Sequence, residues 1–233
     1  MTPAASSSPP SRHRAKATPC VLLTGFDPFG GESTNPSWQA VAALHGRRIA
    51  GHRVIAVQLP TSFRGADKAL RQALREHAPQ RVIAVGQAGR RAEISLERIA
   101  INLIDARIPD NDGDQPIDAP VVAGGPDGYF ASLPLKAIVQ ALRERGIPAA
   151  ISYSAGTYVC NQVFYALMHA LRGKPRVLAG FVHVPYLPEQ AARQPYPVAS
   201  MSLETIVAAL RIVIAGALAA PASAPGWSAG HEA

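Results

Sequence analysis

Short apolar runs alternate along this chain with segments of helical period, and this alternation constrains the fold more than any other feature. Most of the apolar runs are about four to eight residues long, the length of a buried strand. The strand candidates are residues 21–23, 54–57, 82–85, 149–153 and 177–184. The helix candidates are residues 38–44, 66–77, 135–145, 157–171 and 203–219. We therefore expect a three-layer α/β/α fold with a mostly parallel, twisted sheet.

The two ends of the chain differ in composition from its middle. Residues 1–19 are rich in Ser, Pro and Ala, and the stretch from Pro221 onward is similar. Such compositions are typical of segments that cannot bury a core. We expect a disordered tail at 1–19, one catalytic α/β domain at 20–220 and a flexible tail at 221–233.

Charge and composition exclude several function classes. The formal net charge is +7, but three of the basic residues lie in the first nineteen positions, which leaves 20 basic and 16 acidic residues from Cys20 onward. This mild excess forms no basic cluster interleaved with aromatic residues, which argues against nucleic-acid binding. No apolar run reaches the ~20 residues of a membrane helix, and no secretory signal is visible. With only two cysteines, a reducing cytoplasmic location is expected.

Four strand candidates are followed by glycines together with polar or aromatic residues. These segments are TGFDPFGG at 24–31, GQAG at 86–89, SAGTYVC at 154–160 and HVPY at 183–186. In open α/β sheets, ligands bind beyond the carboxyl ends of the strands. If the sheet is parallel, all four segments meet at one edge and form a site there.

Cys160 is the sharpest candidate for a reactive group, because it falls in the first turn of the predicted helix 157–171. The helix dipole and the free backbone N–H groups there favour a thiolate, and the same groups can stabilise an oxyanion. The alternative is that Cys160 is a small buried apolar residue, which is the usual fate of a free cysteine.

A nucleophilic cysteine needs a base, and His183 is the best of the seven histidines. His183 lies in an apolar strand whose end is expected beside that of the Cys160 segment. Taken alone, a histidine in such a strand is more often a satisfied core residue. His169 lies nine positions after Cys160 on the same helix, and therefore on the opposite face. The other histidines lie in the tails, beside a loop or at a helix end: His13, His45, His52, His77 and His231.

The residues alone do not choose the acid that would orient this base. Four acids lie near predicted strand ends: Asp27, Glu93, Glu97 and Asp105. From Glu97 to Asp110, charged and apolar residues alternate, which is equally typical of a strand with a charged outer face.

Five blocks in one order resemble pyroglutamyl-peptidase I, the pyrrolidone-carboxylate peptidases. They are LLTGFDPFGG with NPSW, VGQAG, ERIAIN with ARIPDN and QPID, AGTYVCN with FYALMH, and GFVHVPYLPEQ. The resemblance covers the chain from Val21 to about Gln190. It implies a cysteine exopeptidase that removes N-terminal pyroglutamate from peptides, without a metal or organic cofactor, and a homo-oligomer (dimer or tetramer).

The resemblance also implies roles for individual residues. The nucleophile falls on Cys160, the general base on His183 and the acid on Glu97. The pocket for the flat, uncharged lactam ring falls on aromatic and polar positions. The expected substrate-binding residues are Phe26, Phe29, Asn35, Gln87, Tyr158 and Arg107.

The chain departs from the family pattern at three positions near these blocks. Arg90 stands where a second glycine is common, Leu96 where proline is common, and Tyr158 where phenylalanine is usual. None of the three removes a member of the implied triad. We also expect the loop from Asp110 to Gly128 to border the site.

Three other functions compete with this interpretation. Nucleoside phosphorylases share a similar architecture, and the GFDPFGG loop could cradle phosphate. A binding protein could have kept the fold and lost turnover. A redox sensor using Cys160 would need a second thiol close by, whereas Cys20 is expected at the far start of a strand.

Overall fold

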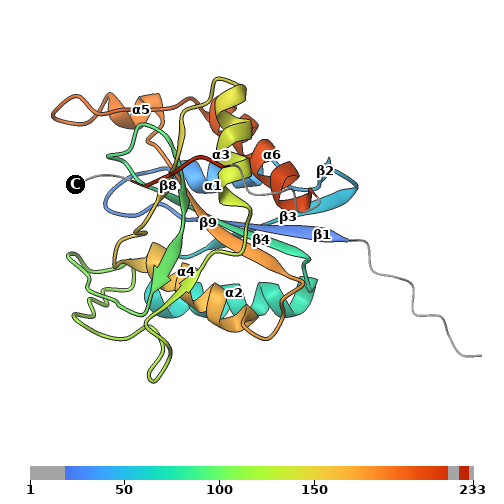
Figure 1. The fold of residues 1–233 in the computed structure, drawn as a ribbon. Coiled ribbons are helices and arrows are strands. Elements are labelled where there is room, and N and C mark those ends of the chain that lie inside the picture. The colour runs from blue at the N-terminus through green and yellow to red at the C-terminus, as the bar shows by residue number, and fades with distance from the viewer. Residues whose placement is uncertain (1–18, 220–225, 231–233) are drawn as a thin grey trace, which may run out of the picture.

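A seven-stranded sheet forms the middle layer of the protein, shown in a computed structural model that describes residues 19–219 and 226–230 (Figure 1). The strands are β1 (Cys20–Phe26), β2 (Arg48–Ile49), β3 (His52–Leu59), β4 (Arg81–Gln87), β5 (Ile94–Glu97), β8 (Ala149–Ser152) and β9 (Leu178–Val184). Their order across the sheet is β2-β3-β1-β4-β9-β5-β8. A separate two-stranded sheet pairs β6 (Ile99–Ile101) with β7 (Gly128–Phe130).

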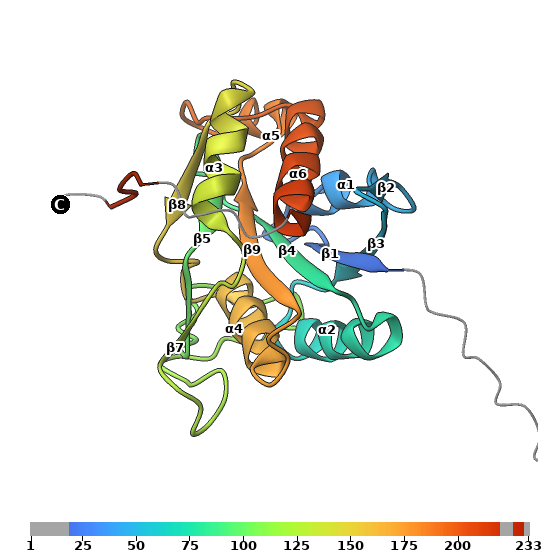
Figure 2. The ribbon, with the colours of Figure 1, turned by 45° about the vertical axis from the view of Figure 1, so that its right-hand side comes forward.

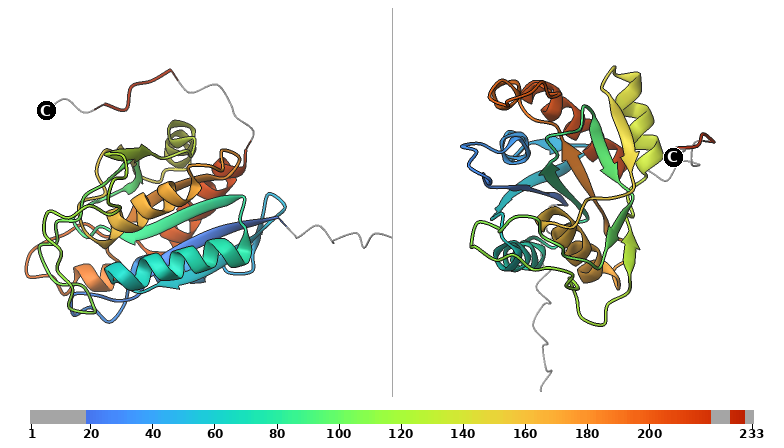
Figure 3. Two further views of the ribbon diagram at one scale, coloured as in Figure 1. Left: turned by 90° about the horizontal axis from the view of Figure 1, so that it is seen from below. Right: turned by 90° about the vertical axis from the view of Figure 1, so that its left-hand side faces the viewer.

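Helices cover both faces of the large sheet. Figure 2 shows α1 (Pro36–Ala42), α3 (Leu135–Glu144) and α6 (Leu203–Leu218) on one face, and α2 (Phe63–His77) and α4 (Val159–Leu171) on the other. Two further views show α2 and α4 lying side by side (Figure 3). A short helix, α5 (Pro188–Ala191), follows β9. Every residue of β1 is buried, as expected for a strand with both faces covered. The three-layer α/β/α prediction is confirmed.

The sheet is mostly parallel, as predicted, but the expectation that four strand ends meet at one edge is wrong for β8. Strands β3, β1, β4 and β9 run parallel, but β5 is antiparallel to β9 and parallel to β8. The end of β8 therefore does not share an edge with the ends of β1, β4 and β9, as we had expected from a parallel sheet. The following connection, residues 153–158, returns the chain to that edge before α4 begins. Apolar runs signal burial, and burial carries no information about direction.

All ten predicted elements are present, with ends shifted by a few residues. The elements that sequence periodicity missed are short: β2, β5, β6, β7 and α5. The alternating stretch after Glu97 yields only the three-residue strand β6 and then irregular backbone. Periodicity needs several repeats to be recognised, which these segments do not supply.

A segment near the C-terminus packs on α3. The Lys136 Nζ donates a hydrogen bond to the Trp227 carbonyl at 2.7 Å. The Trp227 ring lies near two cations, 5.7 Å from Lys136 and 5.5 Å from Arg143. Residues 1–18, 220–225 and 231–233 lie outside the described residues, so most of both predicted tails is untested. No helix in the described ranges is long and apolar enough to cross a membrane.

Candidate active site

Cys160 lies at the point where α4 meets the sheet. It is the second residue of α4, and its side chain rests over Gly86 of β4. A Cβ atom built on Gly86 would lie 2.9 Å from Cys160 Sγ. Gly86 is also the strand partner of His183 across β4 and β9. Strand register therefore brings the predicted nucleophile and the predicted base to one place at the carboxyl ends of β4 and β9.

His183 is paired with Glu97 inside the protein. His183 Nδ1 lies 2.7 Å from Glu97 Oε1, and their side chains are 5% and 0% exposed. The antiparallel pairing of β5 with β9 sets Ser95 opposite His183, and Glu97 projects from the same face two residues further on. A buried histidine held by a buried carboxylate is the arrangement that orients a general base.

Two electrostatic effects act on this pair. Burial by itself raises the pKa of Glu97, but the hydrogen bond and charge of His183 outweigh it, with help from Ser152 and Arg91, and the pKa lies below its usual value. Glu97 is thus ionised at neutral pH and accepts the Nδ1 proton of His183. The other ring nitrogen, Nε2, is then left as the proton acceptor.

Burial raises the pKa of the Cys160 thiol to about 12, with Glu97 adding to the rise and Arg91 opposing it. Desolvation and the nearby Glu97 carboxylate thus act against the thiolate that the helix N-terminus was expected to favour. Removal of the thiol proton therefore calls for a base close by.

The first turn of α4 can stabilise a developing negative charge. Its N-cap residue, Tyr158, makes no side-chain capping bond, and the first hydrogen bond to the Tyr158 carbonyl comes from Gln162 N. The N–H groups before Gln162 have no carbonyl partner within the helix. Backbone N–H groups beside a nucleophile are the usual components of an oxyanion hole.

Aromatic side chains gather around Tyr158. Its ring lies 6.4 Å from Phe29 and 5.4 Å from Phe63, edge-on to the latter. Its hydroxyl donates to the Pro109 carbonyl at 3.0 Å. Burial raises the pKa of Tyr158 to about 12, with smaller contributions from Asp110 and Cys160, so the hydroxyl stays a donor. Phe26, by contrast, is 2% exposed and packs on Phe181.

The predicted polar pocket residues hold loops in place. Asn35 is the N-cap of α1, and its Oδ1 accepts hydrogen bonds from Ser37. Its Nδ2 donates to the Asp27 carbonyl and so ties the helix start to the GFDPFGG turn. Gln87 Oε1 accepts from Gln190 Nε2 at 3.1 Å. These contacts neither require nor exclude contact with substrate, so substrate binding by both residues stays a prediction.

Arg107, a predicted substrate-binding residue, and His169, which the sequence placed on the opposite face of the helix, make no hydrogen bond with the described side chains of Cys160, His183 or Glu97. Arg107 is exposed and makes no hydrogen bond or ion pair with any residue that the structure describes. Its expected role near the nucleophile stays a prediction. His169 Nδ1 pairs with the Tyr129 hydroxyl at 2.8 Å, as expected for the opposite face of α4.

The start of the predicted bordering loop packs against this site. Asp110 accepts a bond from Phe63 N at 2.7 Å, and Asn111 Nδ2 donates to the Pro28 carbonyl at 2.9 Å. Asp27, one of the four acids considered, accepts from Thr61 N and so serves the same junction. The loop from Pro109 to Asn111 thus links Tyr158 to the GFDPFGG turn.

Neither a metal site nor a second thiol accompanies Cys160 in the described ranges. No group of three or more His, Cys, Asp or Glu side chains there is placed to hold a metal ion. Cys20 is buried at the start of β1, where its Sγ lies 3.4 Å from the His77 carbonyl. That is the opposite edge of the sheet from Cys160, so Cys20 is not a resolving thiol for it.

Comparison with known proteins agrees with the sequence blocks. Residues 20–220 match the family model described as pyroglutamyl peptidase. The chain belongs to the pyroglutamyl peptidase family. The pyrrolidone-carboxylate peptidase of Klebsiella pneumoniae is 56% identical over 198 residues, which is 85% of this chain and 92% of that protein. That of Chromobacterium violaceum is 58% identical over 194 residues, with 83% and 90% covered.

Solved structures of pyroglutamyl peptidases have the same fold. The crystal structure of pyroglutamyl peptidase I from Bacillus amyloliquefaciens superposes with a TM-score of 0.83 at 48% identity, covering 85% of this chain and 96% of that one. Pyrrolidone carboxyl peptidase from Thermococcus litoralis gives a TM-score of 0.83 at 43% identity, covering 86% and 93%. The family expectation from the sequence blocks is confirmed.

The sequence analysis missed Arg91, which lies beside the Glu97 carboxylate in the candidate site. Arg91 Nη1 donates to Glu97 Oε1 at 2.6 Å and Nη2 to the Ser154 carbonyl at 2.9 Å. Arg91 lies in the loop after a predicted strand, six residues before the candidate acid Glu97. This signal was too weak to find it, because nothing in the sequence distinguished Arg91 from its exposed neighbour Arg90.

Proposed function

We propose that this chain is a cysteine exopeptidase that hydrolyses the bond after an N-terminal pyroglutamyl residue, with Cys160 as nucleophile, His183 as base and Glu97 as orienting acid. The observation that carries the assignment of roles is the buried hydrogen bond of 2.7 Å between His183 and Glu97. Register places this pair beside Gly86, over which Cys160 Sγ lies.

The proposed chemistry follows from these positions. His183 Nε2 takes the thiol proton as Cys160 Sγ attacks the pyroglutamyl carbonyl, and a C–S bond forms. The N–H groups of the first turn of α4 face the oxyanion. The C–N bond then breaks, and the imidazolium gives its proton to the leaving amine. Water, deprotonated by His183, hydrolyses the thioester and frees Cys160.

The lactam ring accounts for the character of the pocket. Pyroglutamate carries no charged α-amine, so its ring needs apolar walls and a few polar partners. Phe29 and Tyr158 lie close together and offer such a wall. Tyr158 is two residues before the proposed nucleophile in the sequence. Phe26, Asn35, Gln87 and Arg107 complete the proposed set of substrate-binding residues.

Hydrolysis of a fluorogenic pyroglutamyl amide under reducing conditions tests this function. We expect release by the wild type and a loss on the order of 10³-fold or more in Cys160→Ser, because the hydroxyl is a far weaker nucleophile here. A prolyl amide, which has the ring but a charged amine and no lactam carbonyl, should not be cleaved. Cys20→Ala is the matched control and should keep activity.

The possible outcomes separate the alternatives. Activity that survives Cys160→Ser would move the nucleophile elsewhere. A folded wild type that binds pyroglutamyl peptides without cleaving them would favour the binding-protein alternative.

We also propose that the enzyme acts in the cytoplasm on pyroglutamylated peptides and assembles as a homo-oligomer, a dimer or a tetramer. The family resemblance supports the assembly, and the low cysteine content supports the compartment. Light scattering on the full chain measures the assembly, and a monomer mass at micromolar concentration would contradict the proposed oligomer.

A further inference from the structure

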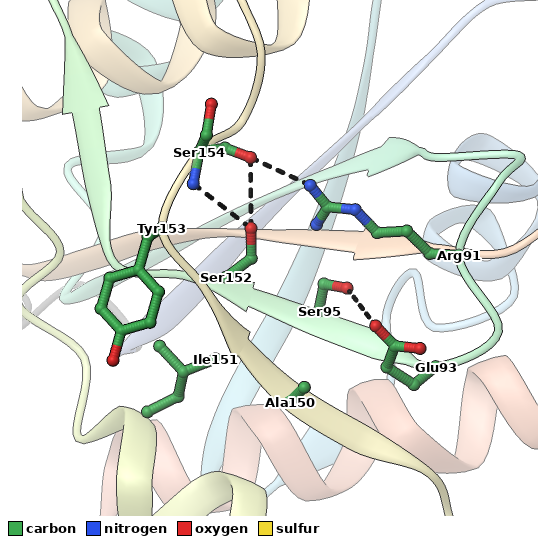
Figure 4. Close-up of a pocket in the computed structure, with 8 residues that line it drawn as sticks. All are labelled: Arg91, Glu93, Ser95, Ala150, Ile151, Ser152, Tyr153 and Ser154. Atoms are coloured by element: carbon green, nitrogen blue, oxygen red, sulfur yellow. Dashed lines mark hydrogen bonds between the residues drawn. The ribbon is translucent and has the colours of Figure 1, made fainter. Parts of the chain in front are cut away.

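The guanidinium of Arg91 joins two parts of the site that are distant in sequence. One nitrogen donates to the Glu97 carboxylate at 2.6 Å, and the other donates to the Ser154 carbonyl at 2.9 Å. Ser154 belongs to the connection that leads from β8 into α4 and hence to Cys160. Figure 4 shows the Arg91 side chain reaching across from its own loop to Ser154.

Arg91 is held on its inner side and open on its outer side. Its backbone N–H donates to the Ala88 carbonyl at 3.0 Å, which tightens the loop between β4 and β5. Its side chain is 28% exposed and lines an open groove of about 450 Å³ beside β8 (Figure 4). The Glu97 side chain is 0% exposed. Arg91 therefore separates the buried carboxylate from solvent.

The two oxygens of Glu97 are used unequally. Oε1 accepts from both Arg91 and His183, whereas Oε2 makes no hydrogen bond to the described residues. The Ser152 side chain on the neighbouring strand also favours the ionised carboxylate. Because both hydrogen bonds fall on Oε1, losing the one from Arg91 leaves the orientation of the carboxylate less fixed. Arg91 thus helps to keep Oε1 turned toward His183 when the imidazole moves its proton.

We propose that Arg91 is a positioning residue of the active site, which orients Glu97 toward His183 and ties the Cys160 connection to the same carboxylate through Ser154. The kinetic part of this inference rests on the proposed function. The guanidinium also lowers the pKa values of both Glu97 and Cys160. Its removal should therefore change the reactivity of Cys160, even where no substrate is present.

Arginine is required for both contacts at once. Its planar fork presents two nitrogens in fixed geometry, whereas lysine offers one point of charge. Arg91→Lys keeps the charge but loses one of the two hydrogen bonds. Arg91→Gln loses the charge. Arg71→Gln is the control for the loss of an ion pair at the surface, because Arg71 Nε donates to both oxygens of Asp67 at 2.9 Å on α2.

Kinetics of pyroglutamyl amide hydrolysis provide the first measurement. We expect kcat to fall by roughly 10- to 100-fold in Arg91→Gln, since small misplacements of a base cost this much. KM should stay within about threefold, because Arg91 is not expected to touch substrate. Arg91→Lys should recover part of kcat, and Arg71→Gln should match the wild type.

Alkylation of Cys160 by iodoacetamide, followed by mass spectrometry so that Cys20 is distinguished, provides a readout independent of turnover. At a fixed pH near 9, we expect Arg91→Gln to react roughly three- to tenfold more slowly than the wild type, which corresponds to a rise of up to about one pKa unit. Arg91→Lys should react at nearly the wild-type rate.

The outcomes distinguish this inference from the proposed function. An inactive but folded wild type would refute the proposed function, and the alkylation rates would still test the effect of Arg91 on Cys160. If Arg91→Gln has the same kcat and the same alkylation rate as the wild type, the inference is overturned. A loss of kcat that only follows a loss of folded protein, with unchanged alkylation, would also overturn it, because Arg91 would then serve stability alone.

Discussion

At the scale of single residues, the site depends on a glycine that leaves room for neighbouring side chains. At Gly86, β4 passes under both Cys160 and Phe181, and Gly86 stands opposite His183. A Cβ there would lie 2.8 Å from Phe181 Cζ and 2.9 Å from Cys160 Sγ, closer than side-chain carbons approach one another. The glycine is thus needed for close approach and not for an unusual φ angle.

Gly86→Ala should therefore damage activity more than stability. The extra methyl group must push Sγ or Phe181 aside, and a displacement of about 1 Å can cost on the order of 10²-fold in kcat. Overpacking should lower the free energy of unfolding by about 1–3 kcal/mol. Gly173→Ala is the control, because its Cβ meets nothing within 4 Å. Wild-type kinetics in Gly86→Ala would show that Sγ does not need its observed position.

At the scale of elements, helix α2 begins with a cap supplied from far along the chain. Its N-cap residue Ser62 makes no side-chain bond, and Ser62 Oγ has no partner in the described part of the chain. Asp110 accepts from Phe63 N instead, and also from the N–H groups of Asp112 and Asp114. One carboxylate thus fixes a helix start and the loop that touches the GFDPFGG turn.

Asp110→Ala should lower the free energy of unfolding by roughly 1–3 kcal/mol, because three backbone N–H groups lose their acceptor. KM for a pyroglutamyl amide should rise, since Asn111 would no longer hold the turn that carries Phe29. Urea denaturation and steady-state kinetics measure the two effects. The free energy of unfolding of Ser62→Ala should stay within about 0.5 kcal/mol of the wild-type value. A large loss of stability in that control would show that Ser62, and not Asp110, caps the helix.

At the scale of the whole molecule, contacts extend beyond the domain shared with the family. The family match ends at residue 220, yet Trp227 packs between Lys136 and Arg143 of α3. The Tyr153 hydroxyl, in the first residue after β8, donates to the Ala229 carbonyl at 3.1 Å. The segment 226–230 thus contacts both α3 and the connection that leads from β8 to Cys160.

Trp227→Ala should lower the free energy of unfolding by about 0.5–2 kcal/mol, because two cation–π contacts and the burial of the ring are lost. That corresponds to a shift in Tm of a few degrees for a chain of this size. Thermal unfolding followed by circular dichroism measures it, with Trp227→Phe as the variant that keeps an aromatic ring. Identical midpoints for wild type and Trp227→Ala would mean that the segment contributes nothing to stability.

The sequence by itself determined the fold class, the long elements and two of the three proposed catalytic residues. Apolar runs and helical periods report burial, and burial is what layers a sheet between helices. The same patterns predicted that Cys160 lies at the start of a helix and His183 near the end of a strand. Glu97 was identified only by resemblance, because four acids lay near strand ends and local pattern does not rank them.

Only the tertiary structure decided which side chains meet. Glu97 and His183 are separated by 86 positions, and their contact depends on the antiparallel register of β5 against β9. The same holds for the link from Arg91 to Ser154 and for the cap that Asp110 supplies to α2. Direction and register are set by pairing between distant segments, whereas periodicity within one segment reports only its own burial.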